Sequence, residues 1–571
     1  MHQIIKYFNL NRFLNLIIVL SFIYSFFYNL VFFELASSPD YDYYFSYIET
    51  FFRISNFTNL DQGLIYHFLV SLILSFSENS LNAQNLEIYI SNSIHLVNNI
   101  LFVISMIGLN YLLKFYNLRN SDRKLIILLT IFLPFLTVAR FHYKPEIFAI
   151  AFTPWMLLNF LRYFKNRNIL NLLFGTTLFI GIVFLKGNIF VMLSLVLFLA
   201  FLSKLKTIQF SHFIAGLVYF FIVSIPIIYE NYRFNNLFLF KNTQKRYTSQ
   251  IYENTVTFDF FTEFSFNKYI RKPNFDPENI NFFSIIFGDT FNDFYGVSWN
   301  IDHFSMKREF FPFENWILNG LLNYSEYYIT FVLSILFYVL IISKSFNLKS
   351  KQEKVFYLAP FIGILILILN STGIPFKNFD PNKGDTFKSI YYSFLLYICV
   401  IYLTKNIFPN LKNSSKIFIL SFFIFLNLFS MGINTEIFKN EKYVQQRTTV
   451  LESSPVCKIG ATFDFGLFDV NCNPPSDSCG KPEIENNYTK KEFDINGNPV
   501  FYIDDKFKEI YLFNSLNLEY IVVEGFDQCY HYLELGYTHP FKLKFLRFPF
   551  FNILIFISMI ASIMVNIFKK I

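Results

Sequence analysis

The chain has 571 residues, of which 54% are hydrophobic and 21% aromatic, and its mean hydropathy is +0.38. Only 16% of its residues are charged, against about 25% in a typical soluble protein. This composition excludes an ordinary soluble protein and predicts an all-α polytopic membrane protein. The net charge of +7 is spread over loops. It therefore indicates membrane topology rather than a nucleic-acid partner.

Apolar segments of about membrane-spanning length predict twelve transmembrane helices. They lie at 13–33, 92–113, 124–139, 146–161, 169–185, 188–203, 211–229, 326–343, 355–371, 387–404, 416–432 and 549–567. The first has no small-residue cleavage site before Glu34, so we expect a span there rather than a signal peptide. The apolar stretch from Leu64 to Phe76 is too short to span, which predicts an interfacial or re-entrant helix.

The basic residues predict which ends of the spans face the cytoplasm. With the N-terminus inside, 20 Lys and Arg residues fall in inner segments and 7 in short outer loops. Positive residues favour the cytoplasmic side, so both termini are predicted to be cytoplasmic. Lys542, Lys544 and Arg547 precede the last span on the outer side and are a local misfit. Segments 34–91, 230–325 and 433–548, and the shorter loop 372–386, are then outside.

Directly after the first span, the chain reads Ser37-Ser38-Pro39-Asp40-Tyr41-Asp42-Tyr43-Tyr44. Ionisable side chains beside an apolar phase are costly, so carboxylates at Asp40 and Asp42 indicate a working site. The alternative is a solvated loop that caps a helix, because Ser, Pro and Asp are common at such positions.

A second polar loop, Arg140-Phe141-His142-Tyr143-Lys144-Pro145-Glu146, lies between the third and fourth spans. Its cations suit a phosphate group, and a carboxylate suits proton transfer. Alternatively, Glu146 is a first-turn carboxylate stabilised by the helix dipole, with Pro145 at the first helical position. His142 is not expected to bind a metal ion, because no second His or Cys has a suitable spacing.

Further polar residues fall on the same predicted side. Lys186 and Asn188 lie between the fifth and sixth spans, and Lys377, Asp380, Lys383, Asp385 and Lys388 lie between the ninth and tenth. Lys377 is a phosphate-binding candidate. For Lys377, Lys383 and Lys388, however, an ordinary solvated loop is the slightly favoured interpretation. The aromatic-rich segment around Asp289 either covers an acceptor site or packs as a structured loop.

The predicted domains are 1–432 in the membrane, 433–548 as a small soluble α+β domain outside it, and 549–571 as a final transmembrane helix. Stretches such as Tyr520-Ile521-Val522-Val523 are strand-like in the soluble domain. Four cysteines lie there: Cys457, Cys472, Cys479 and Cys529. An even number in an exported region predicts two disulfides with undetermined pairing, and free thiols are the alternative. Cys399, within a span, is expected to be a small buried apolar residue.

The Pro39–Tyr44 stretch, the short helix after it and the Arg140–Glu146 loop resemble the integral-membrane glycosyltransferases of the GT-C superfamily. The protein mannosyltransferases and aminoarabinose transferases belong to this group. The resemblance covers residues 1–430 as architecture and only a few residues as motif. It implies a polyprenyl-phosphate-linked sugar donor, a glycan, lipid or protein acceptor, and an active site on the periplasmic face of a bacterial inner membrane.

The resemblance also implies residue roles. Asp40 or Asp42 is the general base that deprotonates an acceptor hydroxyl, and configuration inverts in one displacement. Glu146 is a second acidic residue for the acceptor or for a metal, and Arg140, His142, Lys144 and Lys377 are candidates for the donor phosphate. The chain has Asp-x-Asp where many bacterial members have Asp-Glu, so which aspartate is the base stays open. A divalent cation, Mg²⁺ or Mn²⁺, also stays open.

Two other functions are alternatives. An O-antigen-type polymerase or ligase also has about a dozen spans, but it uses outer-loop arginines and a pyrophosphate-linked oligosaccharide. A polysaccharide or lipid transporter would show internal repeats, broken helices and ionisable residues near the midplane. The predicted spans are nearly free of central charges, which disfavours an ion-coupled carrier.

Overall fold

A computed structural model describes most of the helical part of the chain and short stretches elsewhere. The described residues are 12, 14–23, 48, 51, 62–76, 86–141, 143–205, 208–235, 237–238, 241–242, 261–262, 282–291, 313–371, 387–438, 491–493, 499–501, 507–515, 518–525, 530–537 and 549–568.

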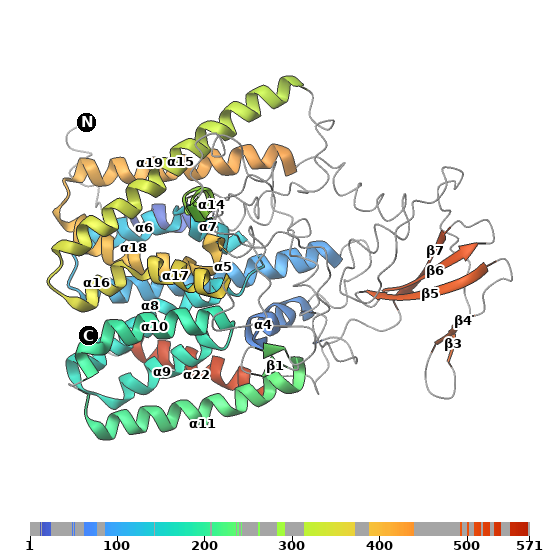
Figure 1. The fold of residues 1–571 in the computed structure, drawn as a ribbon, viewed down its shortest axis with the longest axis horizontal. Coiled ribbons are helices and arrows are strands. Elements are labelled where there is room, and N and C mark those ends of the chain that lie inside the picture. Colours follow the sequence, from blue (N-terminus) through green and yellow to red (C-terminus); the bar gives the residue numbers. More distant parts are fainter. Residues whose placement is uncertain are drawn as a thin grey trace.

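The helices pack side by side as a bundle, and successive long helices run in opposite directions (Figure 1). A short helix at Leu14–Ile23 comes first. The others are α4 (Leu64–Ser75), α5 (Leu86–Phe115), α6 (Asn120–Ile131), α7 (Pro134–Phe141), α8 (Glu146–Asn166), α9 (Ile169–Val183), α10 (Gly187–Leu205), α11 (Phe210–Asn235), α14 (Phe282–Asp289), α15 (Phe313–Asn347), α16 (Lys351–Tyr357), α17 (Ala359–Ser371), η7 (Ser389–Tyr392), α18 (Ser393–Ile407), η8 (Phe408–Asn410), α19 (Asn413–Phe438) and α22 (Phe550–Phe568).

Six helices in the described part of the chain are long and apolar enough to cross a membrane. They are Asn92–Phe115, Glu146–Asn166, Phe210–Arg233, Ile329–Asn347, Ser389–Asn410 and Phe550–Phe568. The bent pair α16 and α17 makes a seventh if it counts as one span. The prediction of a helical membrane protein is therefore confirmed, whereas the predicted number of twelve spans stays a prediction. Four further predicted spans coincide with apolar helices below this length: Leu14–Ile23, Ile169–Val183, Gly187–Leu202 and Asn413–Phe425.

Helix α8 is the central element, since it is buried along most of its length. Its Trp155 lies against α5, where Nε1 donates a hydrogen bond to the Ile104 carbonyl at 2.9 Å. A Cβ added at Gly108 would lie 2.6 Å from this nitrogen, so α5 needs glycine at the contact. Pro154 removes a helical donor from the Ile150 carbonyl, and the Ser105 hydroxyl, 3.0 Å away, replaces it. The replacement donor matters because water, which could otherwise donate to the Ile150 carbonyl, is absent from the apolar core.

Prolines divide two segments that the hydropathy pattern predicts as continuous. The predicted span 124–139 is two helices, because α6 ends at Ile131 and α7 begins at Pro134, a residue that cannot donate to the preceding turn. Likewise, Pro360 follows the junction of α16 and α17, whose axes differ by 58°. The hydropathy pattern reports apolar length, and it does not register the missing N–H group of proline.

Contacts between helix ends fix the direction of the last helix. Glu230, near the end of α11, accepts hydrogen bonds from the Phe551 and Asn552 backbone N–H groups at 3.0 and 2.8 Å, which satisfies donors that a helix start leaves without partners. At the other end of α22, Asn566 accepts a hydrogen bond from Arg162 and donates one to Asn159 at 3.1 Å. Helix α22 therefore starts where α11 ends.

We call the end of the bundle that holds the start of α8 the Glu146 end, and the opposite end, which holds the start of α16, the Glu353 end. Helices α11 and α19 end at the Glu146 end, and α15 and α22 begin there (Figure 1). The chain segments between α11 and α15 and between α19 and α22 therefore both start and end at the Glu146 end. Short turns connect the helices at the Glu353 end.

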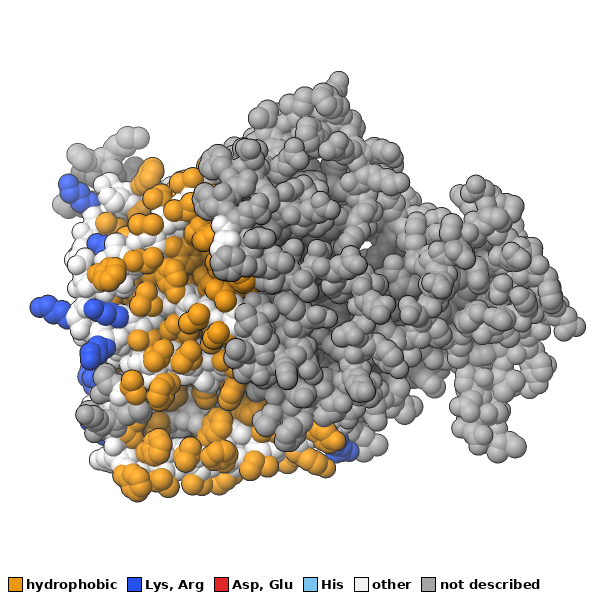
Figure 2. Space-filling view, in the orientation of Figure 1, with side chains coloured by type: hydrophobic (Ala, Val, Ile, Leu, Met, Phe, Trp, Pro, Cys, Tyr) orange, Lys and Arg blue, Asp and Glu red, His pale blue; other side chains and the backbone are white. Residues whose placement is uncertain are grey.

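The surface of the described bundle has two zones. Figure 2 shows a broad band of hydrophobic side chains, with lysine and arginine side chains gathered beyond it at the Glu353 end. Exposed apolar residues on α11, α15, α19 and α22 contribute to this band. Such a surface is stable in lipid and would aggregate in water.

Beyond the helices, the structure describes short antiparallel strands. β1 (Leu237–Phe238) pairs with β2 (Lys241–Asn242), and β3 (Lys491–Phe493) pairs with β4 (Pro499–Phe501). A three-stranded sheet has the order β5 (Phe507–Ser515), β6 (Leu518–Gly525), β7 (Tyr530–Tyr537). The strand-like stretch Tyr520–Val523 lies in β6. The boundaries predicted for the soluble domain stay predictions.

Candidate functional site

The structure describes only some of the residues predicted for the site. Asp40, Asp42, His142 and Lys377 lie outside the described residues, as do Cys457, Cys472, Cys479 and Cys529. Arg140, Lys144 and Glu146 are described and lie together at the turn between α7 and α8. Cys399 is buried in α18 as a free cysteine, as expected.

Glu146 forms a buried ion pair at the start of α8. The Lys186 ammonium group lies 3.1 Å from Glu146 Oε1, and the Glu146 side chain is fully buried. Lys186 comes from the turn between α9 and α10, and its nitrogen lies 4.7 Å from the centre of the Tyr391 ring on η7. Among the described residues, none donates a hydrogen bond to Glu146 Oε2. A buried carboxylate oxygen without a donor is uncommon, and it indicates capacity for a ligand or a water molecule.

The other cations at this end are also buried. Arg140 and Lys144 are each 1% exposed and Lys388 is 6% exposed, so the solvated-loop interpretation of Lys388 is wrong. Burial lowers the pKa of Arg140 to about 9, which leaves its guanidinium group charged at neutral pH. Its carbon Cζ lies 4.8 Å from the centre of the Phe102 ring. Burying a cation is costly unless it is paired or hydrogen-bonded.

Helix α4 supports this end of the bundle from the side. Most of its side chains are buried, so it packs against the rest of the protein. Its prediction as an interfacial or re-entrant helix stays a prediction. Gly63, before its first residue, donates its N–H to the Leu185 carbonyl at 2.8 Å. A Cβ at Gly63 would lie 2.1 Å from the Phe184 carbonyl oxygen, so only glycine permits the approach. Gln62 forms a β-bridge with Lys186, which ties α4 to the backbone that carries the lysine.

His67 on α4 holds the turn that contains Arg140 and Lys144. Its Nδ1 lies 2.6 Å from the Tyr143 hydroxyl and its Nε2 lies 3.2 Å from Gln62 Oε1. A neutral imidazole satisfies both contacts, since Nε2–H donates to the amide oxygen and Nδ1 accepts from the hydroxyl. Burial, and then the Lys186 charge, hold the pKa of His67 well below 6.5. His67 is therefore neutral at physiological pH.

Whether a divalent metal ion could bind can be judged only from the described residues. They contain no group of three or more His, Cys, Asp or Glu side chains that could hold a metal ion. The Glu146 carboxylate already faces an ammonium group. The described residues alone do not form an Mg²⁺ or Mn²⁺ site.

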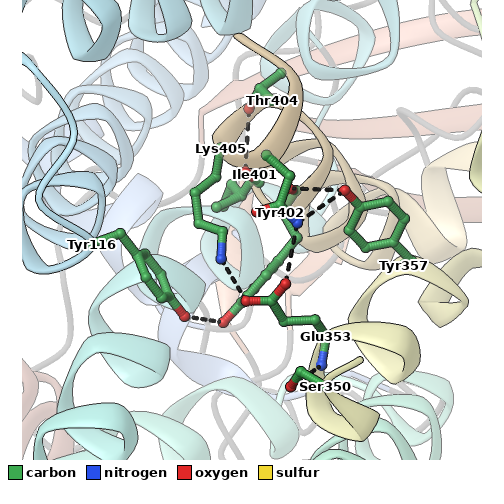
Figure 3. Close-up of polar contacts among 9 residues, drawn as sticks. Tyr116, Ser350, Glu353, Tyr357, Ile401, Tyr402, Thr404 and Lys405 are labelled. Atoms are coloured by element: carbon green, nitrogen blue, oxygen red, sulfur yellow. Dashed lines mark hydrogen bonds and ion pairs between the residues drawn. The ribbon is translucent and has the colours of Figure 1, made fainter. Parts of the chain in front are cut away.

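Charged residues also form a partly buried ion pair at the Glu353 end. Figure 3 shows Glu353 of α16 between residues of α18 and the end of α5. Glu353 Oε1 lies 2.6 Å from Lys405 Nζ, and Oε2 accepts a hydrogen bond from Asn406 at 3.1 Å. The Lys405 nitrogen lies 4.1 Å from the centre of the Tyr116 ring, and the Tyr116 and Tyr402 hydroxyls are 2.8 Å apart.

A second pair at the Glu353 end joins α6 to α19, where Lys416 Nζ lies 2.6 Å from Asp122 Oδ1 and both side chains are at most 3% exposed. Buried charges therefore occur at both ends of the bundle, whereas the sequence analysis places the notable ones at a single face. The two ends differ in how fully these charges are satisfied.

Sequence reasoning placed Glu146, Arg140 and Lys144 near one another because they are neighbours in the chain. It did not find the Glu146–Lys186 pair, because 40 residues separate the partners. It also missed His67, whose only sequence signal is an ionisable residue inside the apolar stretch Leu64–Phe76. Glu146 is the first residue of α8, with Pro145 one position earlier than predicted, as the N-cap.

Comparisons with known proteins give no family for this chain: no family model, no curated protein and no solved structure matches it.

Proposed function

We propose that the chain is a membrane glycosyltransferase that moves a sugar from a polyprenyl-phosphate donor to a cell-surface glycan, lipid or protein acceptor. The reaction takes place at the Glu146 end, on the extracytoplasmic face. The proposed orientation rests on the exposed lysines and arginines, most of which lie at the Glu353 end among the described residues. Such residues favour the cytoplasmic side of a membrane.

The observation that carries the proposal is the Glu146 carboxylate with its surrounding cations. One oxygen faces Lys186, and the other accepts no hydrogen bond from the described residues. Arg140 and Lys144 are buried within the same turn. An enzyme that transfers a sugar from a lipid phosphate must bind two groups together, a phosphate ester and an acceptor hydroxyl. Cations suit the first and an acceptor oxygen suits the second.

In the proposed reaction, Asp40 or Asp42 removes the proton from the acceptor hydroxyl. The hydroxyl oxygen forms a bond to the anomeric carbon while the bond from that carbon to the phosphate oxygen breaks. Polyprenyl phosphate leaves with the bonding electron pair, and the configuration inverts. Arg140 and Lys144, with His142 and Lys377 as further candidates, stabilise the charge on the departing phosphate. Glu146 Oε2 orients the acceptor hydroxyl.

The test is a transfer assay with purified protein and a polyprenyl-phosphate sugar. We expect Asp40→Asn or Asp42→Asn, and also Glu146→Gln, to remove most activity. Glu353→Gln, at the opposite end, is the matched control and should retain it. Full activity in both aspartate variants would reject the proposed base. Transfer from a pyrophosphate-linked oligosaccharide instead would favour the polymerase or ligase.

A transporter is the second candidate, because α16 and α17 form a helix pair bent by 58° and buried ion-paired carboxylates occur at both ends. Broken helices are typical of secondary transporters. The bend comes after the 7 residues of α16, close to the Glu353 end rather than the midplane, so this candidate ranks second. Uptake of a lipid-linked sugar into sealed vesicles without formation of a glycosidic bond would reverse the ranking.

A further inference from the structure

Helix α14 and helix η7 are joined by two hydrogen bonds, both donated by Ser389 and both accepted by Asp289. The Asp289 carboxylate accepts a hydrogen bond from the backbone N–H of Ser389, and the Ser389 hydroxyl donates to the Asp289 carbonyl at 2.9 Å. The two residues are 100 positions apart in the chain, and both are buried. Asp289 therefore connects the segment between α11 and α15 to the start of η7.

Asp289 caps the start of η7, which the residue directly before the helix does not cap. The residue before η7 is Lys388, and its side chain makes no capping hydrogen bond. The first N–H groups of a helix have no partner within the helix, and a buried one is costly to leave without an acceptor. The Asp289 carboxylate accepts one of these groups, and its negative charge suits the positive end of the helix.

Helix η7 in turn positions a ring against the candidate site. Tyr391 is the third residue of η7, and its backbone N–H donates to the Lys388 carbonyl at 3.1 Å. Its ring centre lies 4.7 Å from the Lys186 nitrogen, which pairs with Glu146. An aromatic face attracts an ammonium group at this distance. The orientation of η7 therefore determines one side of the Lys186 environment.

We propose that Asp289 is a positioning residue for the Glu146–Lys186 pair: it fixes the start of η7, and η7 holds the Tyr391 ring over the Lys186 ammonium group. Asp289 does not contact the pair itself. Its effect passes through Ser389 and Tyr391. The kinetic part of this proposal rests on the proposed function, whereas the structural part does not.

The first measurement is the reactivity of the Lys186 amine toward a lysine-selective acylating reagent, quantified by mass spectrometry with Lys405 as the internal reference. Asp289→Ala should raise Lys186 labelling several-fold and leave Lys405 unchanged. Asp289→Asn should stay near the wild-type value, since its amide oxygen still accepts the Ser389 N–H. Tyr391→Leu should raise labelling as Asp289→Ala does, and the double variant should add nothing.

Two control variants distinguish a specific effect on Lys186 from a general loss of structure. Asp122→Ala removes another buried carboxylate at the Glu353 end, so it should lower stability without changing Lys186 labelling. Ser389→Ala removes only the hydroxyl hydrogen bond to the Asp289 carbonyl. It should raise Lys186 labelling above the wild-type value by less than Asp289→Ala does, and it takes the place of Asp289→Ala if that variant does not fold. Wild-type labelling in Asp289→Ala, equal increases at Lys186 and Lys405, or additive effects in the double variant would overturn the proposal.

The second measurement is the transfer kinetics with a polyprenyl-phosphate sugar. Because the ring interaction is modest, Asp289→Ala should raise the donor KM about 3- to 10-fold with a smaller change in kcat. Asp289→Asn should restore most of the effect. An unchanged donor KM in Asp289→Ala, where Glu146→Gln is inactive, would overturn the kinetic part. Labelling that follows the predicted pattern while no form transfers sugar would support the positioning role and reject the proposed function.

Discussion

Each end of the helix bundle holds a glutamate–lysine pair beside an aromatic ring, but the hydrogen-bond acceptors of the two glutamates are satisfied differently. At the Glu353 end, both carboxylate oxygens have partners, Lys405 and Asn406, and the side chain is 24% exposed. At the Glu146 end, one oxygen faces Lys186, the other has no donor among the described residues, and the side chain is fully buried.

This difference separates a structural contact from a candidate site. A polar network whose members are all satisfied makes a local structure rigid, and it has no capacity left for a ligand. A buried carboxylate oxygen without a donor has a free-energy cost that folding alone does not explain. The comparison therefore indicates that the Glu353 pair joins α16 to α18, whereas the Glu146 carboxylate keeps one oxygen without a donor among the described residues.

The largest expected effect is on catalysis at the Glu146 end. Glu146→Gln should lower the rate of sugar transfer about 100-fold or more, because a neutral amide orients and polarises a hydroxyl poorly. The measurement is the initial rate per folded protein, with folding checked by size-exclusion elution. Glu353→Gln provides the matched comparison. Equal activity in the two variants would remove the distinction between the ends.

The next effect is on stability at the Glu353 end. Glu353→Gln leaves the Lys405 ammonium group, which is 9% exposed, without its counter-charge. The free energy of unfolding should fall by on the order of 2–3 kcal/mol, measured by denaturant titration in detergent. The same protein should retain its transfer rate. A variant that unfolds as the wild type does would show that this pair is not a structural contact.

A smaller effect is expected from acidification, through His67. Its pKa in the folded chain lies well below 6.5, and in the unfolded chain it is about 6.5. The unfolded state therefore binds more protons between these values, so stability is fully present above about pH 6.5 and falls as the pH drops below it. Melting temperatures across this range should show the decrease, and His67→Gln should reduce it. An identical pH dependence in His67→Gln would assign it to other groups.

The smallest effect concerns a single hydroxyl at the Glu353 end. Tyr116→Phe keeps the ring against Lys405 and removes the hydrogen bond to Tyr402. It should lower the free energy of unfolding by about 1 kcal/mol and leave transfer unchanged. Thermal unfolding of the two proteins side by side measures the difference. A reduced transfer rate would link this network to the reaction at the opposite end.

Sequence patterns located most helices of the bundle, including the apolar runs that became α5, α8, α11, α18 and α22. They missed the division of 124–139 at Pro134, because hydropathy does not record backbone donors. They also favoured a solvated loop for Lys388, whereas this residue is buried directly before η7. Of the candidate site, the turn from Arg140 to Glu146 was predictable because it is continuous in sequence.

The sequence by itself determined that this is a helical membrane protein, because backbone polar groups in lipid must be paired within each segment and long apolar runs satisfy that requirement only as helices. It also indicated that Glu146 and its neighbours are unusual charges beside an apolar phase. Only the tertiary structure decided which cation reaches which carboxylate. Lys186, Tyr391 and Asp289 come from separate turns of the chain, and their meeting depends on how the helices pack, which no local pattern encodes.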